Sequence, residues 1–424
     1  MKHALFVAYH YPPEASSSGV LRTLKYTRYL EEYGWRVTVI TPRVDAYAVV
    51  DPKLELQIPS HVRVIRTAYL NTKQHLAIRG IYPALLALPD SWIGWAPWAI
   101  AAGRRLLRVD PPDLIYSTSP HATAHLIGMK LAGDAVPWVT DFRDPWIEDP
   151  PEAGAPSGAV YQRINRYLEE RVIHRSGHVV TSTTHLRDML RGRYPKVPPA
   201  KITSILNGYD DADFSGPAQP ERGGDDQLLI LHAGSINQEF RDPRPLLFSL
   251  RRLASAGLIE IDRVRLRFMG AGAFSESQSM KDVITETGTA DRIEFSPRVG
   301  YDEALRELAR ADMLLLLQAS DDTVGLVPAK LYEYLRAQRP VLALVFAGAT
   351  SEVLAMTGGG WAADPRDAEA LDAAVAAAYR AWRRGELANQ CADPRALRQF
   401  DRKALAGQLA NVFDGLVRDR AKVQ

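Results

Sequence analysis

Lys330 and Glu333 are the residues whose types and spacing point most directly to chemistry. They lie three residues apart in the segment 325–335, so on a helix their side chains share one face. Pro328 suits the first turn of such a helix, and the apolar runs on both sides of the segment predict buried strands. A helix that begins here starts at the carboxyl edge of a parallel sheet, where α/β proteins bind phosphate. At such a position a cation can bind the phosphates of a nucleotide, and a carboxylate can accept hydrogen bonds from its ribose hydroxyls. The alternative is a surface ion pair of little energetic consequence.

The loop 11–20, between the first predicted strand and the first predicted helix, is long and rich in small residues. Its serines and Gly19 let the backbone approach a ligand, and the dipole of the following helix attracts an anion. Arg22 lies one turn into that helix. The loop lacks the G-x-G-x-x-G pattern, which disfavours a nicotinamide site. A flexible surface loop is the alternative, although long loops in compact domains are more often functional.

Further polar candidates follow two other predicted strands. His121 stands in a strand-to-helix loop, and Asp141, Arg143 and Asp144 crowd the end of the next strand. We do not expect three charged groups so close to apolar neighbours to be merely solvated. They can pair with one another for structure, or the carboxylates can accept hydrogen bonds from sugar hydroxyls, and the sequence leaves both open.

Composition narrows the class of protein. The chain has 424 residues, more than one ordinary core holds, so two domains are expected. A net charge of +2 offers no overall field to a nucleic acid. Cys391 is the only cysteine, which excludes an internal disulfide and a cysteine-based metal cluster and fits a reducing compartment. The first apolar run is too short for a signal peptide, and no run of about 18 apolar residues predicts a membrane span.

Short β-rich runs alternate with helical patterns along the whole chain, an order that predicts parallel, doubly wound sheets. Near 215–226 the composition shifts to polar residues, glycine and proline, as in a linker, and the alternation then restarts. We therefore expect an α/β fold with two Rossmann-like domains that face a cleft. Strands are expected at 3–8, 36–40, 62–66, 114–117, 138–141, 179–182 and 202–206, and then at 228–232, 264–269, 292–295, 313–317, 341–344 and 359–361.

The expected domain limits follow from this order. The first domain covers 1–210, a linker covers 211–227, and the second domain covers 228–385. A helical segment, 386–424, completes the chain. Its apolar spacing is that of an amphipathic helix, and it can pack on either domain.

The chain resembles the retaining glycosyltransferases of family 4, or group 1, which have the GT-B fold. The resemblance rests on a strand that ends in N-G-x-D with a D-x-F-like tail, at 207–214. The start of the first loop, the segments 34–42 and 141–146, and the segment from Pro328 also look like this family. Each motif is loose, but their order and spacing together are specific and cover nearly the whole chain.

The resemblance implies a nucleoside-diphosphate sugar bound mostly on the second domain and an acceptor mostly on the first. Glu333 matches the glutamate that binds the donor ribose, whereas Gly325 stands where relatives carry a first glutamate. Arg241 matches a phosphate-binding position and, with Lys330, would hold the diphosphate. Arg241 paired with a neighbouring carboxylate on the surface is the alternative. Further donor contacts are expected from Gly234, Ser235, Gly270, Leu331 and Tyr332.

The implied reaction transfers a glycosyl group with retention, so negative charge grows on the leaving diphosphate and must be stabilised. Arg241 and Lys330 suit that role, while His121 or Asp144 would orient the acceptor or the sugar, and Gly19, Arg22 and Asp141 would serve the acceptor or a phosphate. No cofactor or metal is expected, and no nucleic acid. The resemblance favours cell-surface polysaccharide synthesis in the cytoplasm. A GT-B-like nucleotide-sugar 2-epimerase and a non-catalytic nucleotide-sugar-binding scaffold are the alternatives.

Trp92, Trp95 and Trp98 precede a run with Arg104, Arg105 and Arg108. Aromatic groups beside basic ones suit a membrane interface, and lipid-linked acceptors are common in the family, so a peripheral contact with the inner face of the membrane is one reading. A buried helical hairpin in the acceptor domain is the other, and the prolines of this region favour it because they break a long amphipathic helix.

Overall fold

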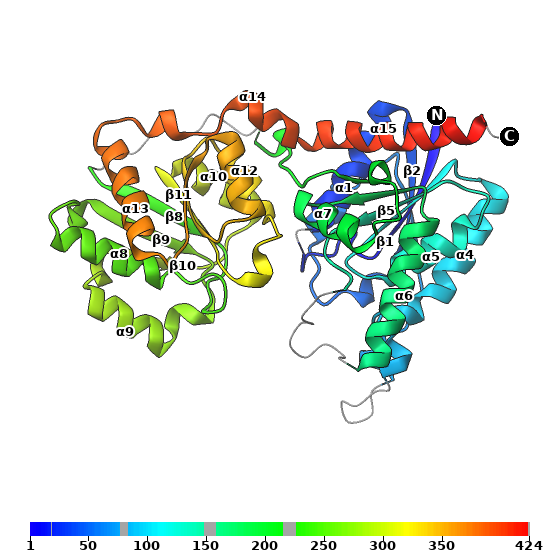
Figure 1. Ribbon diagram of the computed structural model, residues 1–424, viewed down its shortest axis with the longest axis horizontal. Helices are drawn as coiled ribbons and strands as arrows, with labels where there is room; N and C mark the ends of the chain where they lie inside the picture. The colour runs from blue at the N-terminus through cyan, green and yellow to red at the C-terminus, as the bar shows by residue number, and fades with distance from the viewer. Residues whose placement is uncertain (18, 77–83, 148–157, 215–225, 423–424) are drawn as a thin grey trace. The chain divides into compact units, whose positions relative to one another are not determined.

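The computed structural model describes residues 1–17, 19–76, 84–147, 158–214 and 226–422. The chain forms two compact units, Met1–Asn207 with Arg402–Gln424, and Gly208–Asp401. Each unit is a parallel sheet covered by helices (Figure 1), which confirms the expectation of two Rossmann-like domains. The first expected limit, 210, lies close to the division after Asn207. Of the expected linker, 215–225 lies outside the described residues.

The first unit holds a seven-stranded sheet in the order β3-β2-β1-β4-β5-β6-β7. The strand order reverses between β1 and β4, and such a switch point is where doubly wound sheets bind ligands at the carboxyl ends of their strands. Every pairing in this sheet is parallel. The strands are β1 (Lys2–Ala8), β2 (Trp35–Pro42), β3 (Arg63–Thr67), β4 (Leu114–Thr118), β5 (Trp138–Phe142), β6 (His178–Thr181) and β7 (Ile202–Ser204).

Alternate residues of these strands fill two cores. Leu5 and Val7 of β1 belong to a core under α4, α5, α6 and α7, while Ala4 and Phe6 belong to a core under α1 and α15. This alternation has the two-residue period of a strand and explains why both faces read as apolar. The helices are α1 (Gly19–Tyr29), α4 (Ala96–Val109), α5 (Thr123–Ala132), α6 (Ala159–Arg175), α7 (Thr184–Arg193) and α15 (Arg402–Ala421), with short α2 (Pro52–Glu55) and α3 (Thr72–His75).

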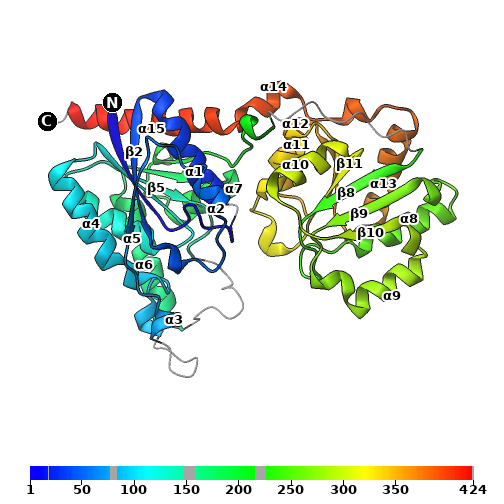
Figure 2. The same ribbon diagram turned by 180° about the vertical axis from the view of Figure 1, so that it is seen from behind.

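The helix α15 comes from the far end of the sequence but belongs to the first unit. Leu405, Leu409 and Phe413 enter the core, where the Phe413 ring meets the Phe6 ring at 6.3 Å. Figure 2 shows α15 running beside α1. The segment expected as one piece, 386–424, is thus divided, with its last helix on the first unit and the rest on the second.

The second unit holds a six-stranded parallel sheet in the order β10-β9-β8-β11-β12-β13, with its switch point between β8 and β11. Helices α8, α9 and α13 cover one face, and α10, α11 and α12 lie on the other (Figures 1 and 2). The strands are β8 (Leu228–Ala233), β9 (Val264–Met269), β10 (Ile293–Ser296), β11 (Met313–Gln318), β12 (Val341–Val345) and β13 (Gly360–Ala363). The helices are α8 (Arg244–Ser255), α9 (Gln278–Thr287), α10 (Tyr301–Arg310), α11 (Ala329–Arg336), α12 (Ala349–Thr357), α13 (Ala368–Arg383) and α14 (Pro394–Leu397).

Candidate functional site

Lys330 lies in the first turn of α11, at the switch point of the second sheet. Its Nζ donates a hydrogen bond of 2.9 Å to the carbonyl of Ala233, the last residue of β8. Gly234 follows with φ at 126°, a conformation that L side chains rarely adopt. A Cβ at Gly234 would lie 2.7 Å from the Lys330 Nζ. The backbone conformation favours glycine at this position, and the absence of a side chain leaves room for the Lys330 ammonium at the end of β8.

Arg241 is held in the loop that follows β8. The Asn237 Oδ1 accepts hydrogen bonds from the backbone N–H groups of Phe240 and Arg241, each at 2.9 Å. The Phe240 carbonyl accepts from the Ala319 N–H just past β11, at 2.8 Å. The Arg241 Nη1 then donates to the Ser235 Oγ at 2.9 Å. The loop is thus folded by its own hydrogen bonds and tied to the neighbouring strand, with its guanidinium at Ser235.

In the part of the chain that it describes, the structure does not show Arg241 in an ion pair with a neighbouring carboxylate, which was the alternative to a phosphate-binding role. Asp242 is occupied by Arg244, whose Nη2 lies 2.7 Å from the carboxylate. Among the described residues Arg241 forms no ion pair, and its guanidinium lies over the Phe240 ring at 4.8 Å. The side chain is therefore available to an anion.

The positive charge of Arg241 affects the protonation of Lys330. Burial and the nearby Arg241 lower the pKa of Lys330 to about 8, and Glu333 only partly offsets this. Burial, with the repulsion of Lys330, also lowers the pKa of His232 to about 3, so this histidine is neutral at pH 7. Two positive charges at the same sheet edge repel each other when the site is empty. A bound diphosphate would attract both charges and offset that repulsion.

Glu333 shares the helix face of Lys330, as its spacing predicts. The Tyr301 hydroxyl, from the start of α10, lies 3.0 Å from the Glu333 Oε1 and 3.3 Å from the Asp213 Oδ2, so it can donate its one hydrogen to either carboxylate. The carboxylate is thus at the same edge and within reach of hydroxyl donors. Leu331 and Tyr332, expected as donor contacts, have side chains that are fully buried in the unit and face away from solvent.

The remaining predicted donor positions lie at neighbouring strand ends. Gly270 follows β9 with φ at 75°, and its N–H donates to the Ser296 carbonyl at 2.8 Å. Ser235 is exposed. Gly325 precedes α11, so the family's first glutamate has no counterpart there, and the nearby Asp321 is exposed, with one oxygen 3.8 Å from Arg366.

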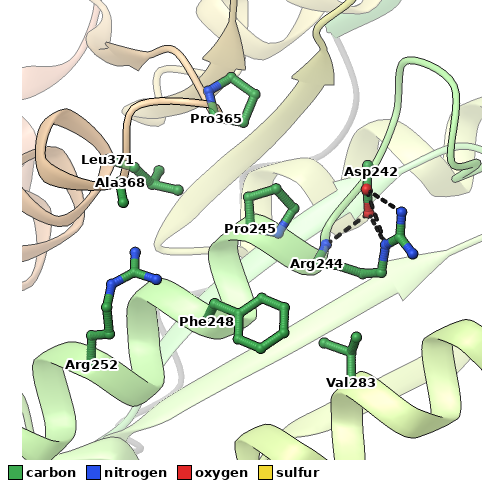
Figure 3. Close-up of a pocket in the computed structure, with 9 residues that line it drawn as sticks. All are labelled: Asp242, Arg244, Pro245, Phe248, Arg252, Val283, Pro365, Ala368 and Leu371. Atoms are coloured by element: carbon green, nitrogen blue, oxygen red, sulfur yellow. Dashed lines mark hydrogen bonds and ion pairs between the residues drawn. The ribbon is translucent and has the colours of Figure 1, made fainter.

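A separate pocket of about 360 Å³ lies between α8, α9 and α13 (Figure 3). Apolar groups form its floor, and its two arginines already have carboxylate partners, Arg244 in Asp242 and Arg252 in Asp372. None of the predicted site residues lines it. Its lining consists of Asp242, Arg244, Pro245, Phe248, Arg252, Val283, Pro365, Ala368 and Leu371.

In the first unit, His121 lies at the switch point between β1 and β4 with a group that the sequence did not single out. Its ring stacks on the His10 ring at 5.6 Å and 16°, and the His10 Nδ1 lies 2.7 Å from the Glu14 Oε2. Burial, opposed mainly by Asp90, lowers the pKa of His121 to about 4. His121 is therefore a neutral hydrogen-bonding group at pH 7.

Glu14 is the fixed charge of this cluster. Burial opposes its ionisation, but hydrogen bonds from His10 and Ser16 outweigh burial and hold its pKa below the ordinary value. An ionised Glu14 carboxylate can only accept, so the His10 Nδ1 donates in this pair. The pair thus fixes the orientation of the His10 ring against His121.

Asp141 and Arg22 form a buried ion pair. The Arg22 Nη2 and Nε donate to the two oxygens of Asp141 at 2.8 and 3.0 Å. The hydroxyls of Tyr116 and Thr118 donate to the same carboxylate, at 2.6 and 2.9 Å. Asp141 is 0% exposed. This geometry favours the structural reading of the pair, and Asp141 pairs with Arg22 rather than with its sequence neighbour Arg143.

Arg143 and Asp144 lie in the same strand-end loop, and both keep partial exposure. Gly19, the first residue of α1, lies directly against the Arg143 guanidinium. The predicted candidates His121, Asp144 and Gly19 therefore gather at one sheet edge, whereas Asp141 is in the interior.

The tryptophan segment divides between interior and surface. Trp92 and Trp95 are buried in a core of the first unit, where the Trp92 ring lies 5.8 Å from the His121 ring, as the buried alternative expects. Trp98 is 43% exposed on α4, on the same helix as three exposed arginines. Residues 79–83 of the segment lie outside the described residues.

Several contacting residues were not identified from the sequence. His10 and Glu14 lie four residues apart around a Tyr-Pro-Pro run, a spacing that gives a signal only once the loop's turn is known. Tyr301 contacts Glu333 from a distant part of the sequence, and Asn237 accepts hydrogen bonds from the backbone of its own turn. Neither contact leaves a recognisable pattern in the sequence. In the part of the chain that the structure describes, no three His, Cys, Asp or Glu side chains gather as a metal site requires. No described helix is long and apolar enough to cross a membrane.

Comparison with known proteins agrees with this geometry. Residues 19–208 match the glycosyl transferase 4-like domain, and residues 219–393 match glycosyl transferases group 1. A search of curated proteins by sequence found no match.

Solved structures share the fold across the whole chain. Sucrose-phosphate synthase from Thermosynechococcus elongatus is 14% identical with a TM-score of 0.63, covering 99% of this chain and 100% of its own. WaaG, a glycosyltransferase involved in lipopolysaccharide biosynthesis, is 15% identical with a TM-score of 0.61, covering 97% and 100%. A protein described as a UDP-N-acetylglucosamine 2-epimerase, from Listeria monocytogenes, is 12% identical with a TM-score of 0.57, covering 96% and 95%.

At these identities the structures establish the fold, and the two domain matches establish the family. Both domains occur in order, each on a doubly wound sheet of its own. The chain belongs to the family 4, or group 1, glycosyltransferases of the GT-B fold, which transfer a glycosyl group from a nucleotide-sugar donor to an acceptor.

Proposed function

We propose that the protein transfers a sugar from a nucleoside-diphosphate sugar to a glycan or lipid-linked acceptor, with retention of the anomeric configuration, in the synthesis of a cell-surface polysaccharide. The observation that carries the proposal is the convergence of Lys330 and Arg241 beside Gly234. Their charges, their approach to the end of β8 and the glycine that permits it match the needs of a diphosphate leaving group.

In the proposed reaction, the bond between the anomeric carbon and the leaving phosphate breaks as the acceptor oxygen attacks from the same face. The acceptor proton passes to the departing phosphate oxygen. Lys330 and Arg241 stabilise the charge that grows on the diphosphate, so no metal is required. Glu333 accepts hydrogen bonds from the donor ribose, and the neutral His121 orients the acceptor or the sugar.

The test of this function begins with the nucleotide. A thermal-shift screen with UDP, GDP, ADP and their sugars should show that one base raises the melting temperature, since ligand binding to the folded state stabilises it. With that donor, Lys330→Ala and Arg241→Ala should each lower transferase turnover at least about tenfold, the effect of removing one charge-assisted contact. Turnover within a few-fold of the parent in both variants would remove the leaving-group assignment.

The epimerase is the alternative with a specific observation behind it, because one structure of the same fold carries that description. An epimerase converts the donor without any acceptor. Incubating the identified donor alone and analysing it by NMR separates the two: an epimer supports the alternative, and an unchanged donor supports transfer. The scaffold alternative rests on Gly325, and it predicts that the nucleotide sugar binds but is neither transferred to an acceptor nor epimerised.

We further propose a cytoplasmic protein with a peripheral membrane contact through α4. Its exposed side carries Trp98 with Arg104, Arg105 and Arg108, which suits an anionic interface. The protein should co-sediment with anionic vesicles at low salt and not with neutral ones, and Trp98→Ala should weaken the binding. Absence of co-sedimentation with anionic vesicles would end this part of the proposal.

A further inference from the structure

Ala233, the last residue of β8, has both of its backbone hydrogen-bonding groups bound by side chains of α11. Its N–H donates to the Tyr334 hydroxyl at 2.9 Å, and its carbonyl accepts from the Lys330 Nζ at 2.9 Å. Tyr334 lies four residues after Lys330, so one turn of the helix places both side chains on the same face. The helix therefore holds this strand residue through its donor and its acceptor.

The two side chains act where β8 and β11 separate at the switch point. The register between these strands runs through Ile230 and Leu231 of β8. Two residues further on, Ala233 bonds to α11, and the next residue, Gly234, bonds to the other neighbouring strand, its N–H donating to the Met269 carbonyl at 2.8 Å. The helix thus takes the place of β11 as the hydrogen-bonding partner of β8 at this edge of the sheet.

Tyr334 has the properties of a group that holds a neighbour and not of one that reacts. Its side chain is 1% exposed, so a substrate does not reach it. Burial raises its pKa, so the hydroxyl keeps its proton and adds no charge beside Lys330. Removing only this hydroxyl leaves the Ala233 N–H without its partner in a place with little access to water, and such a loss is costly.

We propose that Tyr334 is a positioning residue for the donor diphosphate, because its hydroxyl fixes the strand residue whose carbonyl holds the Lys330 ammonium. The Ala233 carbonyl sets where that ammonium lies at the end of β8. Without the bond from its N–H to Tyr334, Ala233 is free to turn, and the ammonium loses its fixed partner. The inference rests on the proposed function and adds to it a residue that acts through Lys330 and does not touch the substrate.

The first experiment measures binding of inorganic pyrophosphate to the full chain by calorimetry at pH 7. Tyr334→Phe should weaken binding roughly three- to tenfold, the range for one lost hydrogen bond. The matched control is Tyr379→Phe, because Tyr379 is also a buried tyrosine of the second unit whose hydroxyl accepts a backbone N–H, that of Glu260 at 3.2 Å. It removes the same kind of bond and should leave the affinity unchanged. A loss in Tyr334→Phe no greater than that in Tyr379→Phe would overturn the proposal.

The second experiment is a double-mutant cycle that tests whether Tyr334 acts through Lys330. In the Lys330→Met background, adding Tyr334→Phe should change the affinity for pyrophosphate less than about twofold, because the ammonium that the hydroxyl positions is gone. A role of Tyr334 that is only structural does not depend on Lys330, so it would give the same loss in both backgrounds. That result would also overturn the proposal.

The same titrations separate this inference from the proposed function. If Lys330→Met does not weaken pyrophosphate binding, the diphosphate assignment in the second unit is wrong and the inference fails with it. If Lys330→Met weakens binding and Tyr334→Phe does not, the diphosphate assignment stands and only the role of Tyr334 is wrong.

Discussion

The low pKa of Lys330 predicts that donor binding depends on pH in a window where the ligand does not titrate. Free Lys330 has a pKa of about 8, lowered by burial and by Arg241 from the ordinary 10.5. A bound diphosphate supplies the missing anion and restores the protonated form. Above pH 8 the free protein has lost this proton, so binding must take one up, and affinity falls as pH rises.

The magnitude follows from the two pKa values. The difference of 10.5 and about 8 is about 2.5 units, which corresponds to at most roughly 3.4 kcal/mol of coupling at 1.36 kcal/mol per unit. Between pH 7 and pH 9 the dissociation constant of the nucleoside diphosphate should rise about tenfold, one unit beyond the lysine pKa. A phosphate monoester loses its last proton near pH 6, so the ligand charge is constant in this range.

Two other buried groups of the site, His232 and Tyr334, do not titrate in the same window. His232, with a pKa of about 3, is neutral throughout. Burial raises the pKa of Tyr334, so it keeps its proton. A slope between pH 7 and pH 9 would therefore report Lys330.

The assay is calorimetric titration with the diphosphate found by screening. Lys330→Met should bind roughly 10- to 100-fold more weakly at pH 7 and lose the slope. Arg241→Gln should move the onset of the slope to higher pH, because Arg241 lowers the lysine pKa. Lys281→Met, on the exposed side of α9, is the control. Equal affinity at pH 7 and pH 9 in the unchanged protein, or an equal slope in Lys330→Met, would refute the reasoning.

Three further variants test other parts of the account. Glu333→Gln should weaken nucleoside diphosphate binding several-fold and leave pyrophosphate binding unchanged in parallel titrations, because only the former has a ribose; equal losses would reject the ribose assignment. Asp141→Asn should cost about 3–5 kcal/mol in urea unfolding, because it leaves Arg22 charged and unpaired in the interior; a loss below 1 kcal/mol would contradict that view. Glu14→Gln should cost about 1–3 kcal/mol at pH 7. The pKa of Glu14 is lower in the folded protein than its ordinary value of 4.5. The difference in stability should therefore be lost as the pH falls below 4.5 and through the folded-state pKa. A loss of stability that does not depend on pH would show that the charge of Glu14 does not stabilise the fold.

The strands were predictable because parallel strands buried on both faces are continuous apolar runs. Each expected strand overlaps an observed one, from 3–8 in β1 to 359–361 in β13. The first predicted helix is α1 followed by a tighter turn, which ends at Gly34 with φ at 81°. The local pattern of apolar residues and glycines determines these strands and this helix, so they can be predicted from the sequence.

The destination of α15 was not predictable in the same way. The apolar stripe of α15 predicts that the helix packs against a core, but not which core. The surface it covers, beside α1, is distant in sequence, and the packing of Phe413 among the aromatic rings of the first unit determines the outcome. The choice of Arg22 over Arg143 as the partner of Asp141 is of the same kind. Sequence proximity favours Arg143, whereas the fold brings the start of α1 to the end of β5.

The shared helix face of Lys330 and Glu333 was predictable, because their spacing of three residues decides it. Side-chain direction limited the rest: Leu331 and Tyr332 lie between those two residues but on the buried side of α11. The contact between Gly19 and Arg143 was not predictable from the sequence. The two residues are more than a hundred positions apart, and no pattern in the sequence links them.

The most direct test of the central claim is a crystal structure with the nucleoside diphosphate identified by screening. The diphosphate should lie at the end of β8, with phosphate oxygens within hydrogen-bond distance of the Lys330 Nζ and the Arg241 guanidinium and with the ribose at Glu333. A diphosphate bound instead in the pocket lined by Phe248, or anywhere that leaves both cations without a phosphate contact, would contradict it.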